Sequence, residues 1–204
     1  MYPIYIFGTG GTGVSMLIWM IKKIINPDYF VDDPISNLYN AHNQPLLQHW
    51  GVNNDSLDKI LSGAPEKERI VHCEPNSQTW GKTPPKSTIV ISAKNTEDLQ
   101  KIAVLRKCKI DIYHDMNLNT LYNLLLENSY TSMSIPDAFN MSTDQLITRN
   151  IEPLIVDLCS FLDVENTLAK SNIIDVHSKW QDGNELLFNQ YMSKFNKIGE
   201  VQND

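Results

Sequence analysis

The sequence predicts an α/β protein built around a mainly parallel sheet, and two observations lead to this fold class. Short apolar runs rich in β-branched residues alternate along the chain with longer segments of helical spacing. The first apolar run passes directly into a glycine-rich turn, Gly8 to Gly13, and then into a helical pattern. Strands that read as continuous apolar runs are typical of parallel sheets covered on both faces.

The strands are expected where apolar runs are short and bounded by turn residues. Thr88 to Ala93 is the most β-branched of these runs. The full set of expected strands is Pro3–Phe7, Arg69–Cys73, Thr88–Ala93, Lys109–Tyr113 and Phe139–Ser142.

Helices are expected where apolar residues recur at three- and four-residue intervals. The first runs from Val14 to Asn26 and is ended by Pro27. Residues 151–162 carry Ile and Leu on one helical face. The remaining expected helices are Asn95–Lys107 and Leu118–Asn128, with short ones near Gln44–Trp50 and Ser56–Leu61.

Length and charge limit the functions open to the chain. Its 204 residues fit one domain, expected at 1–193, followed by a polar tail at 194–204. The net charge of −7 argues against a broad nucleic-acid or anionic-membrane surface. Three cysteines without close spacing and no apolar segment of membrane length favour a cytoplasmic protein, and the scattered histidines indicate no metal site.

The glycine-rich loop is the most informative segment. A strand, a glycine turn and a helix start let backbone amides converge on an anion. The residues expected to contact it are Gly8, Gly10, Gly11, Thr12, Gly13, Val14 and Ser15. The structural alternative is a tight turn whose glycines serve close packing.

The same letters fit two general templates. Gly8, Gly10 and Gly13 match the dinucleotide motif G-x-G-x-x-G, which expects an acidic residue about 20 positions later, and Asp32 and Asp33 are the candidates. Gly8, Gly13 and Ser15 match the phosphate loop of the P-loop kinases, although Val14 replaces the lysine of that motif. A dehydrogenase-like Rossmann enzyme and a P-loop kinase therefore remain alternatives.

A third template covers more of the chain. Gly8 to Leu17 resembles the phosphosulfate loop of the sulfotransferases, G-x-x-[RK]-S-G-T-[ST]-x-L, with Gly11 in the position of the cation. The segments Arg69–Pro75, Ile89–Leu99 and Met141–Asp163 resemble, in the same order, three further segments of that family. The resemblance implies a P-loop NTPase-like, three-layer α/β/α sandwich around a parallel sheet.

The resemblance also implies an activity and its residues. The chain would transfer a sulfuryl group from 3′-phosphoadenosine 5′-phosphosulfate (PAPS) to a hydroxyl or amine of a small molecule or carbohydrate, without a metal. His72 would be the base, with Glu74 as a second candidate, and Lys94 would contact the 3′-phosphate. Since Gly11 has no side chain, the loop cation would come from elsewhere, with candidates Lys22, Lys82, Lys86 and Arg106. A non-catalytic, nucleotide-binding relative of the same fold is the other alternative.

Overall fold

A five-stranded parallel sheet forms the centre of the protein. A computed structural model describes residues 4–29, 48–52, 69–73, 80–127, 133–165 and 167–195 of the chain. The strand order is β2-β3-β1-β4-β5, and each neighbouring pair is parallel. The strands are β1 (Ile4–Phe7), β2 (Gln48–Val52), β3 (Arg69–Cys73), β4 (Thr88–Ser92) and β5 (Phe139–Ser142). The expected α/β class and mainly parallel sheet are confirmed.

Four of these strands lie where the apolar runs predict them. The short helix expected near Gln44–Trp50 is wrong over its described part, because residues 48–50 belong to β2, which pairs with β3 at the edge of the described sheet. The strand expected over Lys109–Tyr113 is also wrong. There Lys109 ends a helix and Asp111–Tyr113 forms a 3-10 turn, which leaves Ile112 77% exposed. The helix expected at Ser56–Leu61 lies outside the described residues.

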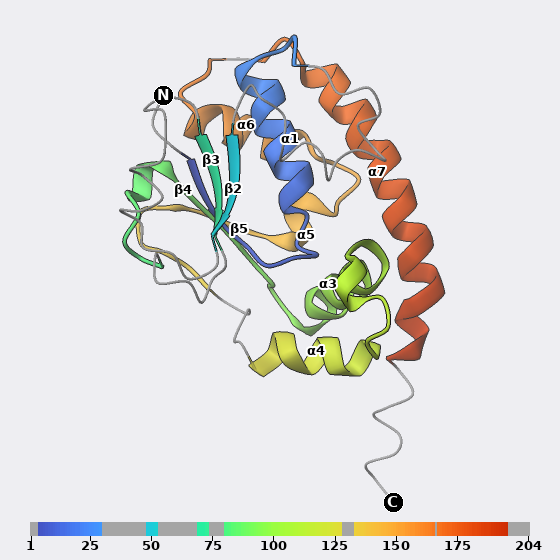
Figure 1. Ribbon diagram of the computed structural model, residues 1–204. Helices are drawn as coiled ribbons and strands as arrows, with labels where there is room; N and C mark the ends of the chain where they lie inside the picture. The colour runs from blue at the N-terminus through green and yellow to red at the C-terminus, as the bar shows by residue number, and fades with distance from the viewer. Residues whose placement is uncertain are drawn as a thin grey trace, which may run out of the picture.

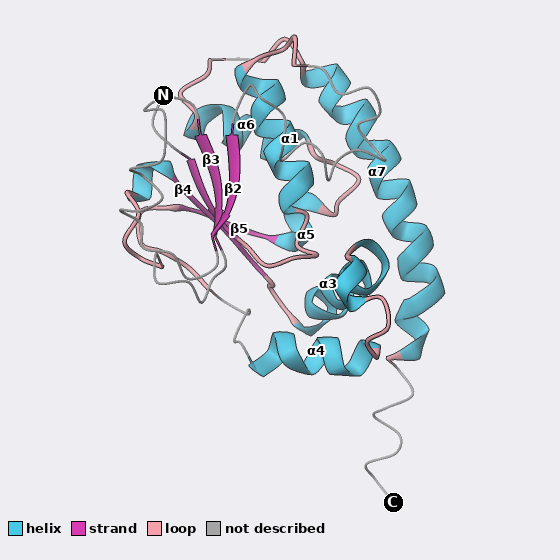
Figure 2. Ribbon diagram, in the orientation of Figure 1, coloured by secondary structure: helices cyan, strands magenta, loops and turns pink. Residues whose placement is uncertain are grey.

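One face of the sheet is covered by three helices: α1 (Val14–Ile25), α6 (Glu152–Phe161) and α7 (Lys170–Tyr191) (Figures 1 and 2). Alternate strand residues point to this face, as the two-residue period of a strand requires. Ile4 and Ile6 of β1 and Ile89 and Ile91 of β4 lie in one apolar cluster with these helices. The α1 segment from Met16 to Ile21 is buried almost completely, between the sheet and α7.

A second group of helices lies beyond the carboxyl end of β4, where α3 (Thr96–Lys109) and α4 (Leu118–Glu127) pack on each other and α3 also packs on α7 (Figure 1). Asn95 begins α3 as its N-cap, since its side-chain oxygen accepts a hydrogen bond from the Asp98 amide at 2.9 Å. The short helix α5 (Thr143–Leu146) follows β5 directly. Single 3-10 turns at Pro85–Ser87 (η2), Asp111–Tyr113 (η3) and Met192–Lys194 (η4) complete the described elements.

The other face of the sheet carries Tyr5, Phe7, Val71, Cys73 and Val90 in a separate apolar cluster. Trp80 packs its ring edge-on against Phe7, with ring centroids 5.1 Å apart. Met133 contacts both this cluster and the α3–α4 group. The arrangement is consistent with a three-layer α/β/α fold.

The first two residues of the expected tail, Lys194 and Phe195, belong to the described fold. Lys194 closes η4, and Phe195 is buried against α3 and α4, with its ring 6.0 Å from that of Tyr122. Residues 196–204 of the expected tail lie outside the described residues.

Candidate functional site

The glycine loop lies at the point where the sheet connections diverge. After β1 the chain turns towards the β3 and β2 side, whereas after β4 it proceeds to β5 on the other side. In open α/β sheets such a divergence leaves a crevice outside the carboxyl ends of the two strands, and ligands bind there. The loop, Gly8 to Gly13, follows β1 directly into α1, so it forms one wall of this crevice.

The glycines of the loop are required by its conformation and by its neighbours. Gly11 and Gly13 have φ angles of 91° and 89°, in the left-handed region that side chains other than glycine rarely adopt. A Cβ atom on Gly11 would lie 2.7 Å from the carbonyl oxygen of Ile102 in α3. A Cβ atom on Gly13 would collide with Leu146 of α5. These glycines therefore allow close packing of α3 and α5 on the loop, which does not decide whether the loop amides bind an anion.

The carbonyl groups of the loop are turned towards protein donors. The Gly8 oxygen lies 2.6 Å from Nε2 of His72. The Thr9 oxygen accepts from both the amide and the hydroxyl of Thr12, at 3.2 and 2.7 Å. The Gly10 oxygen accepts from Nε of Arg106 at 2.6 Å. These contacts fix the peptide planes of the loop from its protein side.

Most amide groups of the loop, in contrast to its carbonyl groups, form no hydrogen bond within the described residues. In the described part of the chain, the N–H groups of Gly10, Gly11, Gly13 and Val14 have no hydrogen-bond partner. Gly13 is the N-cap of α1 and supplies no side-chain cap. Gly10, Gly11 and Gly13 are also partly exposed, whereas Thr9 and Thr12 are buried. Unpaired amides at a helix start, next to solvent, form the arrangement that backbone anion sites use.

Arg106 is the buried cation beside the loop. Besides its bond to Gly10, it donates through Nη2 to the hydroxyl of Thr9, and its guanidinium lies 5.1 Å from the ring centroid of Tyr113. Of the four cations considered as replacements for a loop lysine, Arg106 is the one whose contacts place it against the loop. Because it binds carbonyl and hydroxyl oxygens of the loop, it holds the loop in shape from behind.

His72, like Arg106, forms a hydrogen bond to a carbonyl oxygen of the loop. A hydrogen bond to a carbonyl oxygen requires Nε2 of His72 to carry the proton, so this nitrogen donates to Gly8. His72 is paired in register with Ile6 of β1, one residue before the end of β3. The structure thus gives His72 a loop-supporting contact. Glu74, the second candidate base, lies outside the described residues.

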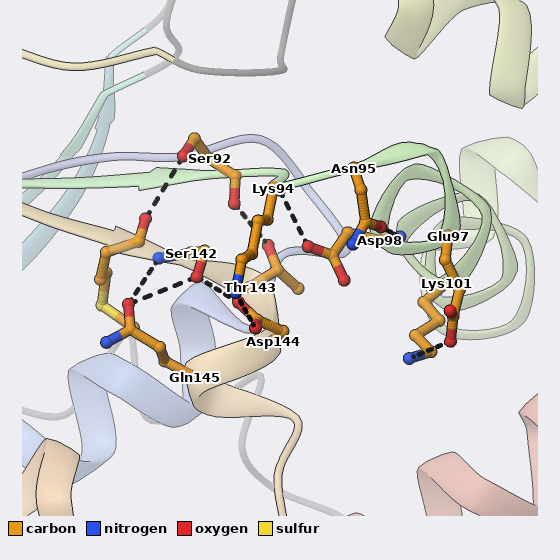
Figure 3. A network of polar contacts seen from close by, with 11 residues as sticks. Ser92, Lys94, Asn95, Glu97, Asp98, Lys101, Ser142, Thr143, Asp144 and Gln145 are labelled. Carbon is orange, nitrogen blue, oxygen red and sulfur yellow. Dashed lines mark hydrogen bonds and ion pairs between the residues drawn. The ribbon is translucent and has the colours of Figure 1, made fainter.

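Lys94 lies at the same edge of the sheet, just after β4, and it faces the first turn of α5 (Figure 3). Its ammonium is 3.5 Å from Asp144, and its side chain is 67% exposed. The neighbouring network ties β4 to β5, since Thr143 donates to the carbonyl of Ser92 at 3.2 Å. Asp98 accepts from the amide of Lys94 at 2.8 Å, which secures the start of α3.

Side chains of α7 and of the end of α3 also lie near the loop, and of these Lys109, His177 and Asn184 were not expected at the site. Trp180 of α7 has a ring atom 3.5 Å from the position of a Cβ on Gly13. Lys109 at the end of α3 donates to the amide oxygen of Asn184, and its ammonium lies 5.2 Å from the Trp180 ring centroid. His177 contacts the Leu146 carbonyl at 2.6 Å. In the sequence, the signal for these residues is the spacing of His177, Gln181 and Asn184, which places three polar side chains on one face of a helix.

Other features of the described residues lie away from the loop. A surface cavity of about 540 Å³ lies between α6 and the start of α7, and another of about 440 Å³ lies between α3, α4 and η4. Within the described ranges, no group of three His, Cys, Asp or Glu side chains is placed to hold a metal ion. No helix among these residues is long and apolar enough to cross a membrane.

Comparisons of the chain with protein-family models, with curated proteins and with solved structures find no match.

Proposed function

We propose that the Gly8–Ser15 loop binds the anionic group of a phosphorylated nucleotide without a metal ion, as the phosphosulfate loop of a P-loop, sulfotransferase-like domain does. The observation that supports this most strongly is the difference between the carbonyl groups and the amide groups of the loop. Its carbonyls at Gly8, Thr9 and Gly10 are bonded to the protein, whereas the amides of Gly10, Gly11, Gly13 and Val14 are unpaired in the described residues.

The physical argument rests on preorganisation. A loop whose carbonyls are already fixed does not reorganise when an anion arrives, so little binding energy is lost to ordering. The start of α1 adds the partial positive charge of a helix N-terminus. Arg106 contributes a buried positive charge from behind the loop. An acidic protein with a net charge of −7 holds an anion best through such a local arrangement.

The proposed reaction is sulfuryl transfer from PAPS. The bond between sulfur and the bridging phosphate oxygen breaks, and a bond forms between sulfur and the acceptor oxygen or nitrogen. The products are adenosine 3′,5′-bisphosphate and the sulfated acceptor, and the acceptor proton passes to a base. Because Nε2 of His72 supports Gly8, this role requires His72 to act through Nδ1, or Glu74 to act in its place.

The non-catalytic relative is favoured by the same contact of His72. A histidine that holds the loop serves binding even where no acceptor is deprotonated. This second candidate predicts nucleotide binding that is as tight as in the enzyme and no turnover with any acceptor.

The other two alternatives fit the geometry less well. The dinucleotide fold has the strand order 3-2-1-4-5-6, with β2 beside β1. Here β1 lies between β3 and β4, and β2 is the edge strand. The kinase motif needs a lysine at position 14, but Val14 is buried, and its Cγ2 lies 2.9 Å from the position of a Cβ on Gly8.

The test is calorimetric titration of the purified chain with three ligands: adenosine 3′,5′-bisphosphate with EDTA, NADH, and ATP with magnesium. We expect binding of the bisphosphate without metal. Ser15→Ala removes a hydroxyl at the start of α1 without adding atoms, and we expect it to weaken binding by roughly fivefold to tenfold, the value of one hydrogen bond. Ser171→Ala, on an exposed turn of α7, is the matched control and leaves binding unchanged.

The outcomes separate the candidates. Binding of NADH alone favours the dinucleotide alternative, and a strict magnesium requirement with ATP favours the kinase. Bisphosphate binding together with loss of sulfate from PAPS to an acceptor supports the enzyme, whereas binding without transfer supports the non-catalytic relative. Absence of bisphosphate binding at millimolar concentration overturns the proposal.

A further inference from the structure

The glycine loop itself carries no cationic side chain from Gly8 to Ser15. Gly11 occupies the position at which the sulfotransferase loop carries a lysine or arginine. Arg106 is committed to the other side, where it bonds to the Gly10 carbonyl and the Thr9 hydroxyl. A bound phosphate or phosphosulfate group needs a further positive charge close to the unpaired amides.

Among the described residues, Lys109 is a lysine whose immediate neighbours pack on the loop. It follows Arg106 by one helical turn and is the last residue of α3. The next residue, Ile110, has its Cδ1 2.7 Å from the position of a Cβ on Gly10. The ammonium of Lys109 lies against the ring of Trp180, and the same ring packs at Gly13. Two neighbours of Lys109, Ile110 and Trp180, thus pack against Gly10 and Gly13 of the loop.

We propose that Lys109 supplies the cation that neutralises the anionic group bound on the Gly8–Ser15 loop, in place of the missing loop lysine. This inference rests on the proposed function. In the structure without ligand, Asn184 accepts a hydrogen bond from the ammonium. When the anion is present, the ammonium donates to an oxygen of that anion.

The surroundings of Lys109 favour this exchange. Among the described residues, Lys109 has no carboxylate partner, and its hydrogen bond to Asn184 is to a neutral amide. Although the residue as a whole is exposed, its ammonium is partly buried, and burial lowers its pKa to about 8. A bound anion stabilises the charged form and so raises this pKa.

Among the described residues, the titratable and charged groups near Lys109 lie on α3, α7 and η4, and they include Lys107, Tyr191 and Lys194 beside Cys108. Cys108 and Arg106 lie on its own helix, and burial raises the pKa of the Cys108 thiol. On α7, the ring of His177 lies tilted against that of Trp180 with centroids 5.6 Å apart, and burial lowers the pKa of His177. Since His177 is mostly neutral above pH 7, Lys109 is the group whose charge changes near pH 8 at the ligand side of the loop.

The experiment measures the affinity for adenosine 3′,5′-bisphosphate by calorimetry in EDTA, for the wild type and three variants. Lys109→Met removes the charge and keeps the apolar stem, and Lys109→Arg keeps the charge. Lys86→Met is the matched control, because Lys86 is an exposed lysine in η2, at the amino end of β4. At pH 7 we expect Lys109→Met to weaken binding by roughly tenfold to a hundredfold, the value of a hydrogen bond to a charged group.

The pH dependence distinguishes a ligand contact from a structural role. Above pH 8 the free lysine loses its proton, and binding must restore it, so the wild-type affinity falls by up to about tenfold per pH unit. Lys86→Met follows the wild type. Lys109→Arg keeps its affinity to pH 10, because arginine stays charged, and Lys109→Met shows no such fall.

Each result decides between the two claims. If the wild type binds the bisphosphate and Lys109→Met binds within twofold of it, the role of Lys109 is wrong and the proposed function stands. If Lys109→Met does not fold, the wild-type titration from pH 7 to 10 still decides, since a constant affinity overturns the role. If the wild type does not bind, the proposed function fails and the inference with it.

Discussion

Replacement of Arg106 by methionine tests whether the loop is held in shape from its protein side. Arg106 is 7% exposed, and its guanidinium bonds to the Gly10 carbonyl at 2.6 Å and to the hydroxyl of Thr9, a fully buried residue. Methionine keeps the apolar stem and loses both bonds. A hydrogen bond to a charged group contributes about 1.5–3 kcal/mol, and water can replace the donor at Gly10 but not at Thr9. We therefore expect a loss of about 3 kcal/mol of unfolding free energy.

The assay is urea denaturation followed by tryptophan fluorescence, together with calorimetric titration of adenosine 3′,5′-bisphosphate. The matched control is Arg149→Met, because Arg149 also bonds to two side chains, Asp182 and Glu185. Since those pairs lie on the surface, the control should leave the unfolding midpoint almost unchanged. The reasoning is refuted if Arg106→Met costs less than about 1 kcal/mol, or if it binds the bisphosphate as well as the control does.

Three further substitutions test particular contacts by denaturation. Gly13 has a φ of 89°, so Gly13→Ala should lower the unfolding free energy by about 2 kcal/mol or more. In a Leu146→Ala background, where the new methyl group no longer collides with Leu146, the loss should be only about 1 kcal/mol. Equal losses in both backgrounds would disprove the contact. Lys22→Met should raise the unfolding free energy at pH 7 by up to about 3 kcal/mol, since burial lowers the pKa of Lys22 from 10.5 to about 8. This gain should shrink between pH 8 and 10.5, because in that range Lys22 of the wild type is protonated in the unfolded chain and neutral in the folded one. A lower unfolding free energy of Lys22→Met at pH 7 would contradict the prediction. Asn95→Ala removes the N-cap of α3 and should lower the unfolding free energy by about 1 kcal/mol. An unchanged unfolding free energy would contradict the role of Asn95 as N-cap.

Three of the strands that the sequence predicted, β1, β3 and β4, have apolar residues that face two layers, and their Ile, Val and Phe stand out from the flanking turns. β5 carries only Phe139 and Met141, both packed in the cluster on one face of the sheet. The edge strand β2 reads Gln-His-Trp-Gly-Val and has no such pattern. It is specified by pairing with β3, which is a tertiary contact that local spacing does not encode.

Two helical regions were also missed because tertiary contacts, and not local spacing, determine their structure. The Lys109–Tyr113 segment has strand-like alternation, but Ile110 packs towards Gly10 and Ile112 is exposed, as on a helical turn. The helix α7 was not expected, because buried polar residues interrupt its apolar stripe. Gln181 lies among them and donates to the Ile147 carbonyl at 3.2 Å. Such partners compensate burial of a polar group, and sequence periodicity does not reveal them.

The candidate site was partly visible in the sequence. The glycine loop and its position after a strand follow from local letters, and the structure places them as expected. The residues that complete the surroundings of the loop, Arg106, Leu146 and Trp180, come from three separate helices. Arg106 was one of four cations considered, and only the packing of α3 on the loop distinguishes it.

The central claim is that the unpaired amides of the loop receive an anion, and amide NMR tests it most directly. A ¹⁵N–¹H correlation spectrum of the wild-type chain would be recorded in EDTA during titration with adenosine 3′,5′-bisphosphate. We predict that the amides of Gly10, Gly11, Gly13 and Val14 show the largest shifts, saturating with a single affinity. Largest shifts in another region, or no shift at these four amides at millimolar ligand, would contradict the account.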